Sequence, residues 1–504
     1  MKNILLFGAG KSATVLIQFL LNQAAAEGWK LTLVDANLEL AQSKLQQHPY
    51  GQAAAFDITQ DAERKRHIQQ ADLVISLLPP ALHILVARDC VAEKKNLLTA
   101  SYVDEAMKAL QPEIEAHGLL FLCEMGLDPG IDHMSAKKLI DEIEAKGGKI
   151  TSFISHCGGL VAPESDDNPW HYKISWNPRN VVMAGKAGAV FLQDGVVKEW
   201  SYRQLFEEKR FTEIPEHDPL CWYPNRDSLS YVKTYGLDDA VTFIRTTLRH
   251  PDFMYGWKNI IDLQLTDEQV QYNTDGKSLK DLFKEHFEKH QFSDWLEQKL
   301  SEQFTYTKDI LAELVNLTAM EEKASSKGME PLEEFMVVNE TGDLQQVDIE
   351  DLKLNAAAAL AEKMHDAKIT LKQLFFLGMD DGETIVNKGL CSAADILQFA
   401  LEKKLALQAE DKDMVVMKHE IEYLLDQNLY KHTSTLVAKG NDASHTAMAA
   451  TVGLPLGIAA QLILKGTIGC KGLHIPIAKE IYEPVLAALQ DQGISFTEEN
   501  SLLT

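Results

Sequence analysis

Residues 2–13 of the chain read KNILLFGAGKSA, and this stretch decides the fold that the sequence predicts. An apolar run ends at Gly8, and the pattern Gly-x-Gly-x-x-Ala continues through Gly10 to Ala13. The segment that follows, residues 15–20, has the apolar spacing of an amphipathic helix. Strand, glycine turn and helix in this order form the context in which such a motif binds the pyrophosphate of a dinucleotide.

The cofactor predicted from this motif is NAD or NADP. The two glycines allow the backbone to approach the pyrophosphate, whose charge is stabilised at a helix N-terminus. Asp35 ends the second predicted strand, where a carboxylate can accept both ribose hydroxyls of NAD and would repel the 2′-phosphate of NADP. The local chemistry therefore favours NAD, while Lys11 beside the turn leaves NADP as the alternative.

Short apolar runs alternate with helix-length amphipathic stretches over the first 125 residues. The runs occupy residues 3–7, 30–34, 53–56, 73–77, 96–99 and 119–122. This alternation predicts an α/β fold with a doubly wound parallel sheet. From about residue 149 the pattern changes, and a second domain of α+β type is expected from β-like runs at residues 150–156, 181–184 and 241–248. Residues 278–325 have helical spacing, and turn-rich segments at 325–328 and 339–342 suggest an exposed insertion.

Charge is distributed unevenly along the 504 residues, whose formal net charge is −25. So acidic a chain repels phosphate backbones, which argues against nucleic acid and anionic membrane surfaces as partners. All nine arginines precede residue 250, and six of them lie between Arg179 and Arg249. Residues 265–440 contain no arginine and carry 34 acids against 19 lysines. The arginine-rich stretch is therefore the place to expect an anionic small molecule.

The cysteines and the apolar segments indicate a soluble protein in a reducing compartment. Six cysteines are widely spread without a C-x-x-C pair, which argues against a disulfide framework and a zinc site, and we predict no metal. The N-terminal apolar run leads directly into the glycine turn and is expected to be a strand instead of a signal peptide. Residues 447–464 are the most apolar late stretch, but Gly453, Pro455, Gly457 and Gln461 break it, and we expect it to be too polar and too interrupted to span a membrane. We therefore expect a cytoplasmic location.

Five further segments, taken in order, resemble the saccharopine dehydrogenase family, specifically its glutamate-forming branch (saccharopine reductase). They are residues 74–79 (VISLLP), 99–103 (TASYV), 124–133 (EMGLDPGIDH), 156–160 (HCGGL) and 223–228 (YPNRDS). The similarity continues at residues 247–249, 414–419, 447–461 and 472–483, and it is vague between about 265 and 365. Several motifs in the right order are far more specific than any one of them.

The resemblance implies a reaction and a domain plan. Saccharopine, water and NAD(P)⁺ would give L-glutamate, 2-aminoadipate 6-semialdehyde and the reduced nucleotide, or the reverse. A Rossmann dinucleotide-binding domain would comprise residues 1–125 and be completed by a C-terminal helix from about 440–475. An α+β substrate and dimerisation domain would comprise 126–265, about 370–439 and 476–504, with a smaller helical domain at 266–369. A homodimer is expected on the same basis.

Carried over position by position, the resemblance also implies binding residues. The nucleotide would contact Gly8, Gly10, Lys11, Ser12, Asp35, Ala36, Asp57, Ile58, Leu78, Ala100, Ser101, Leu127, Asp128, Pro129 and Ser175. The substrate would contact Ser101, Tyr102, Asp128, Arg226, Thr247, Leu248 and Arg249. Saccharopine carries three carboxylates, and arginine recognises a carboxylate better than lysine does. The remaining arginines of the stretch, Arg179, Arg203, Arg210 and Arg245, are expected to form surface ion pairs.

Three residues are candidates for the chemistry. Asp128 could hold the substrate ammonium and stabilise imine charge, or it could only cap the helix that follows. Tyr102 could donate or relay protons to the amine. Cys157 could do so only with a lowered pKa and is otherwise a buried, inert thiol. None of them is singled out as the general base, and His83 is set aside as a packing or loop residue.

Other functions stay open on the sequence alone. Carboxynorspermidine dehydrogenase and lysine 6-dehydrogenase are similar amine oxidoreductases, although the HCGGL and YPNRDS segments favour saccharopine. A non-catalytic NAD-binding redox sensor is the alternative from another class, and Asp128, Tyr102, Arg226 and Arg249 together argue against it. A structural assembly protein that docks through its acidic helical region is a third possibility.

Overall fold

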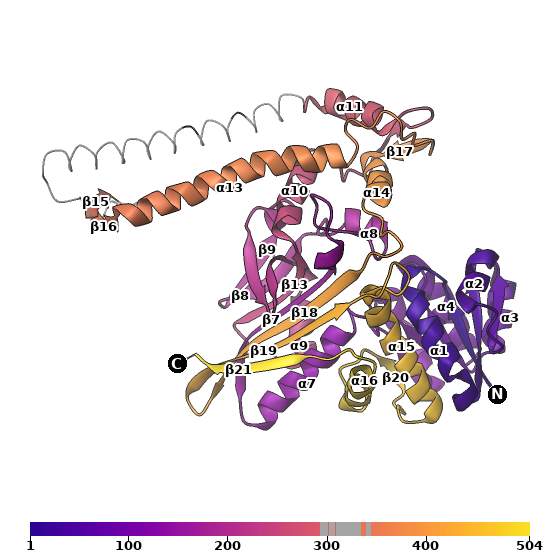
Figure 1. The fold of residues 1–504 in the computed structure, drawn as a ribbon. Helices are drawn as coiled ribbons and strands as arrows, with labels where there is room; N and C mark the ends of the chain where they lie inside the picture. Colours follow the sequence, from indigo (N-terminus) through magenta and orange to yellow (C-terminus); the bar gives the residue numbers. More distant parts are fainter. Residues whose placement is uncertain (293–300, 302–307, 309–333, 339–343, 504) are drawn as a thin grey trace, which may run out of the picture. The chain divides into compact units, whose positions relative to one another are not determined.

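The computed structural model describes residues 1–292, 301, 308, 334–338 and 344–503 (Figure 1). It divides into two compact units. The first comprises Met1–Asp167, His171–Pro251 and Leu405–Thr504, and the second comprises Asn168–Trp170 and Asp252–Lys404. The finer division into three domains stays a prediction.

The first unit begins with a sheet of seven parallel strands in the order β20-β6-β5-β4-β1-β2-β3. Its strands are β1 (Lys2–Phe7), β2 (Trp29–Asp35), β3 (Gly51–Ala55), β4 (Leu73–Ser76), β5 (Asn96–Thr99), β6 (Leu120–Leu122) and β20 (Gly472–His474). Each of the six apolar runs predicted in the first 125 residues is a strand. The predicted parallel α/β sheet is therefore confirmed, and a seventh strand joins it from near the C-terminus.

Helices connect successive strands of this sheet. They are α1 (Thr14–Glu27), α2 (Leu38–Leu45), α3 (Asp61–Gln69), α4 (His83–Ala92), α5 (Glu105–Lys108) and α6 (Gln111–Ala116). A short 3₁₀ turn, Lys11–Ala13, leads from the glycine turn into α1. Parallel strands need such crossovers, and all of their carboxyl ends therefore meet along one edge of the sheet.

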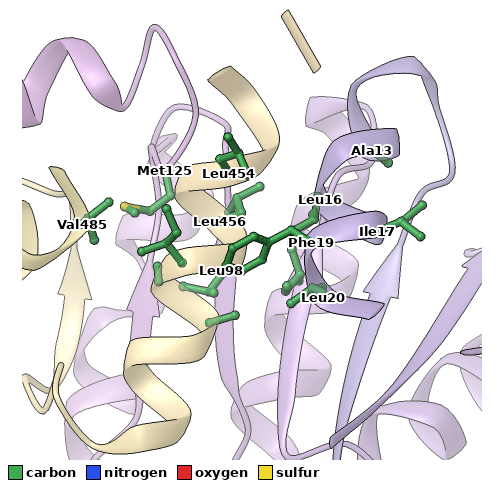
Figure 2. Packing of buried hydrophobic residues seen from close by; sticks show 14 of the residues in the cluster. Ala13, Leu16, Ile17, Phe19, Leu20, Leu98, Met125, Leu454, Leu456 and Val485 are labelled. Carbon is green, nitrogen blue, oxygen red and sulfur yellow. The ribbon is translucent and has the colours of Figure 1, made fainter. Parts of the chain in front are cut away.

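Helix α15 (Ala447–Lys465) lies beside α1 although more than 400 residues separate them (Figure 1). Figure 2 shows Leu16 and Phe19 of α1 in one apolar cluster with Leu454 and Leu456 of α15. Among the described residues, α15 is the one helix long and apolar enough to cross a membrane, and 67% of its apolar window is buried inside the protein. A core helix passes the same test, and the packing accounts for its composition.

The expected interruption of this segment is wrong, because α15 is continuous through Pro455. Its two glycines serve a close helix contact instead. A Cβ on Gly453 would lie 2.9 Å from the backbone nitrogen of Leu16, and one on Gly457 would lie 2.6 Å from the ring of Phe19. Helix α16 (Lys479–Asp491) follows and contributes Val485 to the same cluster.

A mixed ten-stranded sheet forms the rest of the first unit. Its main path is β10-β11-β13-β7-β18-β19-β21, and β8, β9 and β12 branch from it. The strands are β7 (Lys149–Val161), β8 (Ala189–Gln193), β9 (Val196–Trp200), β10 (Arg210–Ile214), β11 (His217–Pro224), β12 (Arg226–Asp227), β13 (Thr242–Arg249), β18 (Asp413–Leu425), β19 (Asn428–Lys439) and β21 (Thr497–Leu502). Helix α7 (Ile131–Ala145) connects the parallel sheet to β7 and packs on this strand.

One predicted strand of this region is wrong. The run at residues 181–184 belongs to a short helix, α8 (Pro178–Val182), and the turn after it. The side chain of Asn177 accepts hydrogen bonds from the backbone N–H groups of Arg179 and Asn180, and Pro178 occupies the first turn. A cap and a proline at the start of a helix outweigh the β preference of two valines.

The second unit is mainly helical among its described residues. It contains α10 (Pro251–Asp262), α11 (Leu279–His290), α13 (Ile349–Phe376), α14 (Ala393–Lys404) and the strand pairs β14 (Val270–Asn273) with β17 (Leu390–Ser392) and β15 (Glu334–Val338) with β16 (Leu344–Asp348). Helix α11 confirms the first part of the helical prediction for residues 278–325. Most of the remainder, with the turn-rich segments at 325–328 and 339–342, lies outside the described residues.

The close contact between α1 and α15 predicts a stability effect. Replacing Gly453 by alanine forces the two backbones apart, and this overpacking exceeds the gain in helix propensity. We expect G453A to lower the free energy of unfolding by about 1 kcal/mol. Gly469 has open space where a Cβ would stand, and G469A should change stability by less than about 0.5 kcal/mol. Urea denaturation of both variants measures the difference, and equal midpoints would contradict the packing account.

Candidate functional site

The residues predicted to bind the nucleotide lie along the carboxyl edge of the parallel sheet. These residues come at or shortly after the end of a strand. In the order of the strands across the sheet, the strand ends are those of β3 (Asp57, Ile58), β2 (Asp35, Ala36), β1 (Gly8, Gly10, Lys11, Ser12), β4 (Leu78), β5 (Ala100, Ser101) and β6 (Leu127, Asp128, Pro129). Segments spread over more than 100 residues of sequence thus meet along one edge. In an open α/β sheet this is the edge at which ligands bind.

The glycine turn after β1 fits a dinucleotide. Gly8 has φ +102°, and a Cβ there would stand 2.7 Å from the carbonyl oxygen of Leu77, so a larger residue would clash. Gly10 is exposed, and a Cβ on it would enter open space. The backbone can therefore be approached closely where the chain enters Lys11–Ala13 and then α1. Lys11 is exposed and Ser12 half-buried at the same helix entrance.

The carboxylate of Asp35 is hydrogen-bonded to the glycine turn beside which the ribose is predicted to bind. Its Oδ2 accepts a hydrogen bond from the backbone N–H of Ala9 at 2.9 Å, and its Oδ1 accepts one from Asn37 at 3.0 Å. The carboxylate consequently stands beside the glycine turn in a fixed orientation. Ala36 next to it is exposed.

The neighbouring positions form the outer part of this edge. Asp57 accepts hydrogen bonds from the backbone N–H and the hydroxyl of Thr59, at 2.9 and 2.7 Å, and both lower the pKa of its carboxyl. Ile58 and Leu78 pack on one apolar cluster of the sheet. The site thus has an apolar floor and two carboxylates at its outer end.

Ser175 lies away from the strand ends, at the N-terminus of α15. It is buried and hydrogen-bonds to Asp413, whose carboxylate also accepts bonds from the backbone N–H groups of Ala447 and Met448 at 2.5 and 3.0 Å. Helix α15 in turn contacts the turn Lys11–Ala13. Ser175 is therefore connected to the glycine turn through this helix.

The candidate catalytic residues Tyr102 and Asp128 are in direct contact beyond β5 and β6. The Tyr102 hydroxyl donates to Oδ1 of Asp128 at 3.0 Å. The guanidinium of Arg245, from β13 of the other sheet, donates to the same Oδ1 at 2.6 Å and to Oδ2 of Asp132 at 2.8 Å. Tyr102 and two carboxylates thus surround one guanidinium. Among the described residues, no hydrogen bond reaches Oδ2 of Asp128, which leaves that oxygen for a ligand.

The expectation that Arg245 forms a surface ion pair is wrong, since only 5% of this residue is exposed. A buried guanidinium requires carboxylate partners, and Asp128 and Asp132 supply them from more than 100 residues away in the sequence. The signal that could have found Arg245 is its place in the middle of the strand TFIRTTLR, where it lies between apolar residues and threonines. Arg203, by contrast, forms the expected exposed ion pair with Glu207.

The cluster moves the pKa values of its two aspartates in opposite directions. Burial, reinforced by the negative charge of Asp132, raises the pKa of Asp128 although Arg245 opposes this shift. The pKa of Asp132 is lowered despite burial, because His133, Arg245 and the backbone N–H of Gly130 favour its ionised form. Two carboxylates with separated pKa values are the arrangement from which acid–base catalysis is built. Asp128 is the one suited to take up and return a proton.

A helix-cap role for Asp128 does not hold, because Gly130 occupies the position before α7. Gly130 has φ +148°, and a Cβ there would lie 2.0 Å from the carbonyl oxygen of Gly126. The carboxylate of Asp132 accepts the Gly130 N–H at 2.6 Å. The turn that carries Asp128 is therefore tightly determined by its own backbone.

Cys157 lies on β7 directly beside Thr247 of β13. Burial raises the pKa of its thiol well above the ordinary value, and the charges of Asp128 and Asp132 act in the same direction. The thiol is therefore protonated at neutral pH and can serve only as a weak hydrogen-bond donor.

The two arginines predicted to bind substrate differ in exposure. Arg226 is exposed on β12, and its guanidinium lies 5.6 Å from the centre of the Tyr102 ring. Arg249 is only 3% exposed, donates to the carbonyl of Leu248 at 2.8 Å and lies over Tyr172. Tyr102, Asp128 and Arg226 are thus brought together, while Thr247, Leu248 and Arg249 form the end of β13 beyond Arg245.

Two histidines lie beside the site: His133, which the sequence did not single out, and His83, which was set aside as a packing or loop residue. His133 of α7 bonds to Oε2 of Glu124 at 2.8 Å and to the Tyr235 hydroxyl at 2.5 Å, and Glu124 also accepts the backbone N–H of Val103 next to Tyr102. His83, at the start of α4, contacts Ser101 at 2.8 Å. Both lie in or beside motifs that carry the family resemblance.

Comparisons with known proteins find relatives that match almost the whole chain. Residues 4–122 match the domain described as "Saccharopine dehydrogenase NADP binding domain", and residues 126–494 match "Saccharopine dehydrogenase C-terminal domain". An NADP(+)-dependent, L-glutamate-forming saccharopine dehydrogenase of Saccharomyces cerevisiae is 33% identical over 503 residues, 99% of each chain. The enzyme of the same description from Pyricularia oryzae is 30% identical, again over 99% of each. The apo structure of a histidine-tagged L-Glu-forming saccharopine dehydrogenase from S. cerevisiae superposes with a TM-score of 0.77 at 29% identity, covering 99% of this chain and 100% of that one.

The buried ion cluster predicts a large stability effect for Arg245. Replacing it by glutamine leaves Asp128 and Asp132 buried without their cation, which costs about 3–5 kcal/mol. Arg226 is exposed, and R226Q should change the free energy of unfolding by less than about 0.5 kcal/mol. Denaturant unfolding of the two variants gives both values. Equal, small effects would show that Arg245 is not the buried partner of these carboxylates.

Proposed function

Because the chain belongs to the saccharopine dehydrogenase family, we propose that it is an oxidoreductase that cleaves saccharopine with NAD(P)⁺ to L-glutamate and 2-aminoadipate 6-semialdehyde, or joins them in reverse. The observation that carries this proposal is the Tyr102–Asp128–Arg245 cluster at the carboxyl edge of the NAD(P)-binding sheet. It supplies a proton acceptor, a proton donor and a buried cation beside the expected cofactor position.

The nucleotide would be held by the strand ends. The backbone at Gly8 and Gly10 and the start of α1 would receive the pyrophosphate, Asp35 the ribose of the adenosine half, and Ala100 to Ser101 the nicotinamide half. The bound, oxidised nicotinamide would supply the hydride acceptor for the carbon that becomes the aldehyde. The tasks of the polypeptide are orientation, proton transfer and direction of water.

Asp128 is the residue proposed to move the substrate proton. The secondary amine of saccharopine must be neutral before its C–H bond can lose hydride, since the nitrogen lone pair forms the new C=N bond. The Asp128 carboxylate takes that proton, and its raised pKa places this transfer closer to neutrality. Water adds to the imine carbon and loses one proton to solvent, which gives the carbinolamine. Asp128 then returns its proton to nitrogen, and the carbinolamine hydroxyl loses its proton to solvent as the C–N bond breaks, so that the aldehyde and glutamate form.

Tyr102 and Arg245 would keep Asp128 in place through these steps. Both donate to Oδ1, so the carboxylate presents Oδ2 to the amine. Burial raises the pKa of the Tyr102 phenol well above its ordinary value, so Tyr102 stays a hydrogen-bond donor. Arg245 compensates part of the negative charge that burial of the two aspartates would otherwise accumulate.

The substrate carboxylates would be bound by arginine. Arg226 lies over the Tyr102 ring with its guanidinium exposed, where a carboxylate can approach it in a bidentate geometry. Thr247, Leu248 and Arg249 would extend this binding surface along the end of β13. A net charge of −25 makes such local cations necessary for a tricarboxylate.

Substitution of Asp128 by asparagine tests the proposed function. The amide keeps the shape and loses the proton acceptor, and we expect kcat for saccharopine oxidation to fall about 10²–10⁴-fold. Asp239 forms an exposed ion pair with Lys149, so D239N is the matched control and should retain full activity. Saccharopine-dependent reduction of the nucleotide measures both variants. Undiminished turnover by D128N would refute the assignment.

The pH dependence follows from the raised pKa of Asp128. Oxidation requires the ionised carboxylate, so kcat/KM should fall as the pH drops through that pKa, which lies above the ordinary aspartate value of 3.8. The acidic limb of the profile should disappear in D128N. An acidic limb of unchanged position in the variant would assign it to another group.

For nucleotide preference, we propose that Asp35 favours NAD over NADP, in contrast to the relatives whose names specify NADP(+). In D35N the amide oxygen can still accept a backbone hydrogen bond at the glycine turn, while the negative charge is removed. The kcat/KM for NADP relative to NAD should therefore rise about tenfold, the equivalent of about 1.4 kcal/mol. Steady-state kinetics with both nucleotides measures this ratio. Equal efficiency of NAD and NADP in the unmodified protein would defeat the argument.

A further inference from the structure

Three side chains form an unbranched hydrogen-bond chain behind the nucleotide edge of the sheet. Ser76 is the last residue of β4, His83 is the first residue of α4, and Ser101 follows β5. The Ser76 hydroxyl oxygen lies 2.8 Å from Nδ1 of His83, and Nε2 of the same ring lies 2.8 Å from the hydroxyl oxygen of Ser101. Both ring nitrogens are therefore occupied by serine hydroxyls from adjacent strand ends.

The imidazole of His83 is neutral under ordinary conditions. Only 5% of the residue is exposed, and burial lowers its pKa to about 4 while the charge of Asp104 opposes this shift. A neutral imidazole has one N–H donor and one acceptor nitrogen. The chain therefore has a direction: one serine donates to the ring, and the ring donates to the other serine.

The direction of these hydrogen bonds decides whether the Ser101 hydroxyl can donate a hydrogen bond to a ligand or only accept one. If Nε2 carries the proton, it donates to Ser101, whose own hydroxyl proton is then free to point into the site. If Nδ1 carries the proton, Ser101 donates to the ring and offers only lone pairs. The backbone N–H of Ser101 bonds to the hydroxyl of Thr99 at 3.2 Å, which fixes the main chain and leaves hydroxyl rotation as the remaining freedom.

We propose that His83 is a positioning residue that holds the hydroxyl of Ser101 in one orientation toward the bound nucleotide and substrate. This inference rests on the proposed function only in assigning Ser101 to both ligands. Ser76 is fully buried and serves as the inner anchor, so that the ring cannot rotate without losing a hydrogen bond. His83 does not itself reach the ligand and acts through Ser101.

A matched pair of substitutions separates positioning from packing. Asparagine places its amide near the position of Nδ1 and can keep the bond to Ser76, whereas glutamine reaches the position of Nε2 and can keep the bond to Ser101. We expect H83N to lower kcat/KM for saccharopine about tenfold, the equivalent of about 1.4 kcal/mol. H83Q should retain kcat/KM within about threefold, the equivalent of about 0.7 kcal/mol. H117N, at an exposed histidine, is the neutral control.

The double variant H83N/S101A makes this comparison decisive. If His83 acts through Ser101, the double variant should be no slower than S101A alone, because the hydroxyl that His83 orients is already absent. Equal losses in H83N and H83Q, or fully additive losses in the double variant, would overturn the proposal and leave His83 a packing residue.

A spectroscopic measurement covers the case in which the variants fold poorly. Nitrogen-15 NMR of the histidine-labelled protein should show His83 as a single neutral tautomer between pH 6 and 8, and S101A should shift its Nε2 resonance while leaving Nδ1 nearly unchanged. A protonated ring, an equal mixture of tautomers or an unaffected Nε2 would contradict the inference. This readout needs no turnover, so an unmodified protein inactive on saccharopine would refute the proposed function and leave the NMR test intact.

Discussion

One guanidinium buried between two carboxylates is the interaction on which the candidate site depends. Arg245 comes from the mixed sheet, whereas Asp128 and Asp132 belong to the turn and helix that follow the parallel sheet. Removing charges from water is costly unless they are paired with good geometry. The three groups therefore fix the position of Arg245 in the mixed sheet relative to Asp128 and Asp132. The same contact orients Tyr102. Burial raises the pKa of Asp128 above its ordinary value, whereas His133 and Arg245 hold the pKa of Asp132 below its ordinary value. One ion cluster therefore both connects the two sheets and contains the candidate catalytic residues Tyr102 and Asp128.

The remainder of the site follows from the topology. The parallel sheet places the glycine turn, Asp35, Ser101 and Asp128 on one edge, because the carboxyl ends of parallel strands all lie on the same side of the sheet. Helix α15 covers this sheet from the far end of the sequence and connects the glycine turn with Ser175 through Asp413. The long separation in sequence has a physical reason: the apolar face of α1 needs a partner, and α15 supplies it.

Much of the fold could be predicted from the sequence because its signals are local. Six apolar runs bounded by turns became six strands, and the glycine pattern identified the nucleotide edge. The burial of Arg245 and the hydrogen bonds of His83 could not be predicted, because they depend on partners that only the folded chain brings near: Asp128 and Asp132 for the arginine and two serines for the histidine. The strand expected at residues 181–184 failed because the capping Asn177 and the proline after it start a short helix and outweigh the β preference of two valines. The homodimer and the cytoplasmic location stay predictions.

The structure shows what several arginines of the arginine-rich stretch, residues 179–249, contact. Six arginines lie between residues 179 and 249, and at least two of them already have acidic partners within the protein, since Arg245 neutralises buried aspartates and Arg203 pairs with Glu207 on the surface. The most direct test of the central claim is to measure glutamate and reduced nucleotide together, with saccharopine as the only substrate. The account predicts that both products appear at the same rate in a one-to-one ratio. Nucleotide reduction by a carboxylated polyamine, with none from saccharopine, would contradict it.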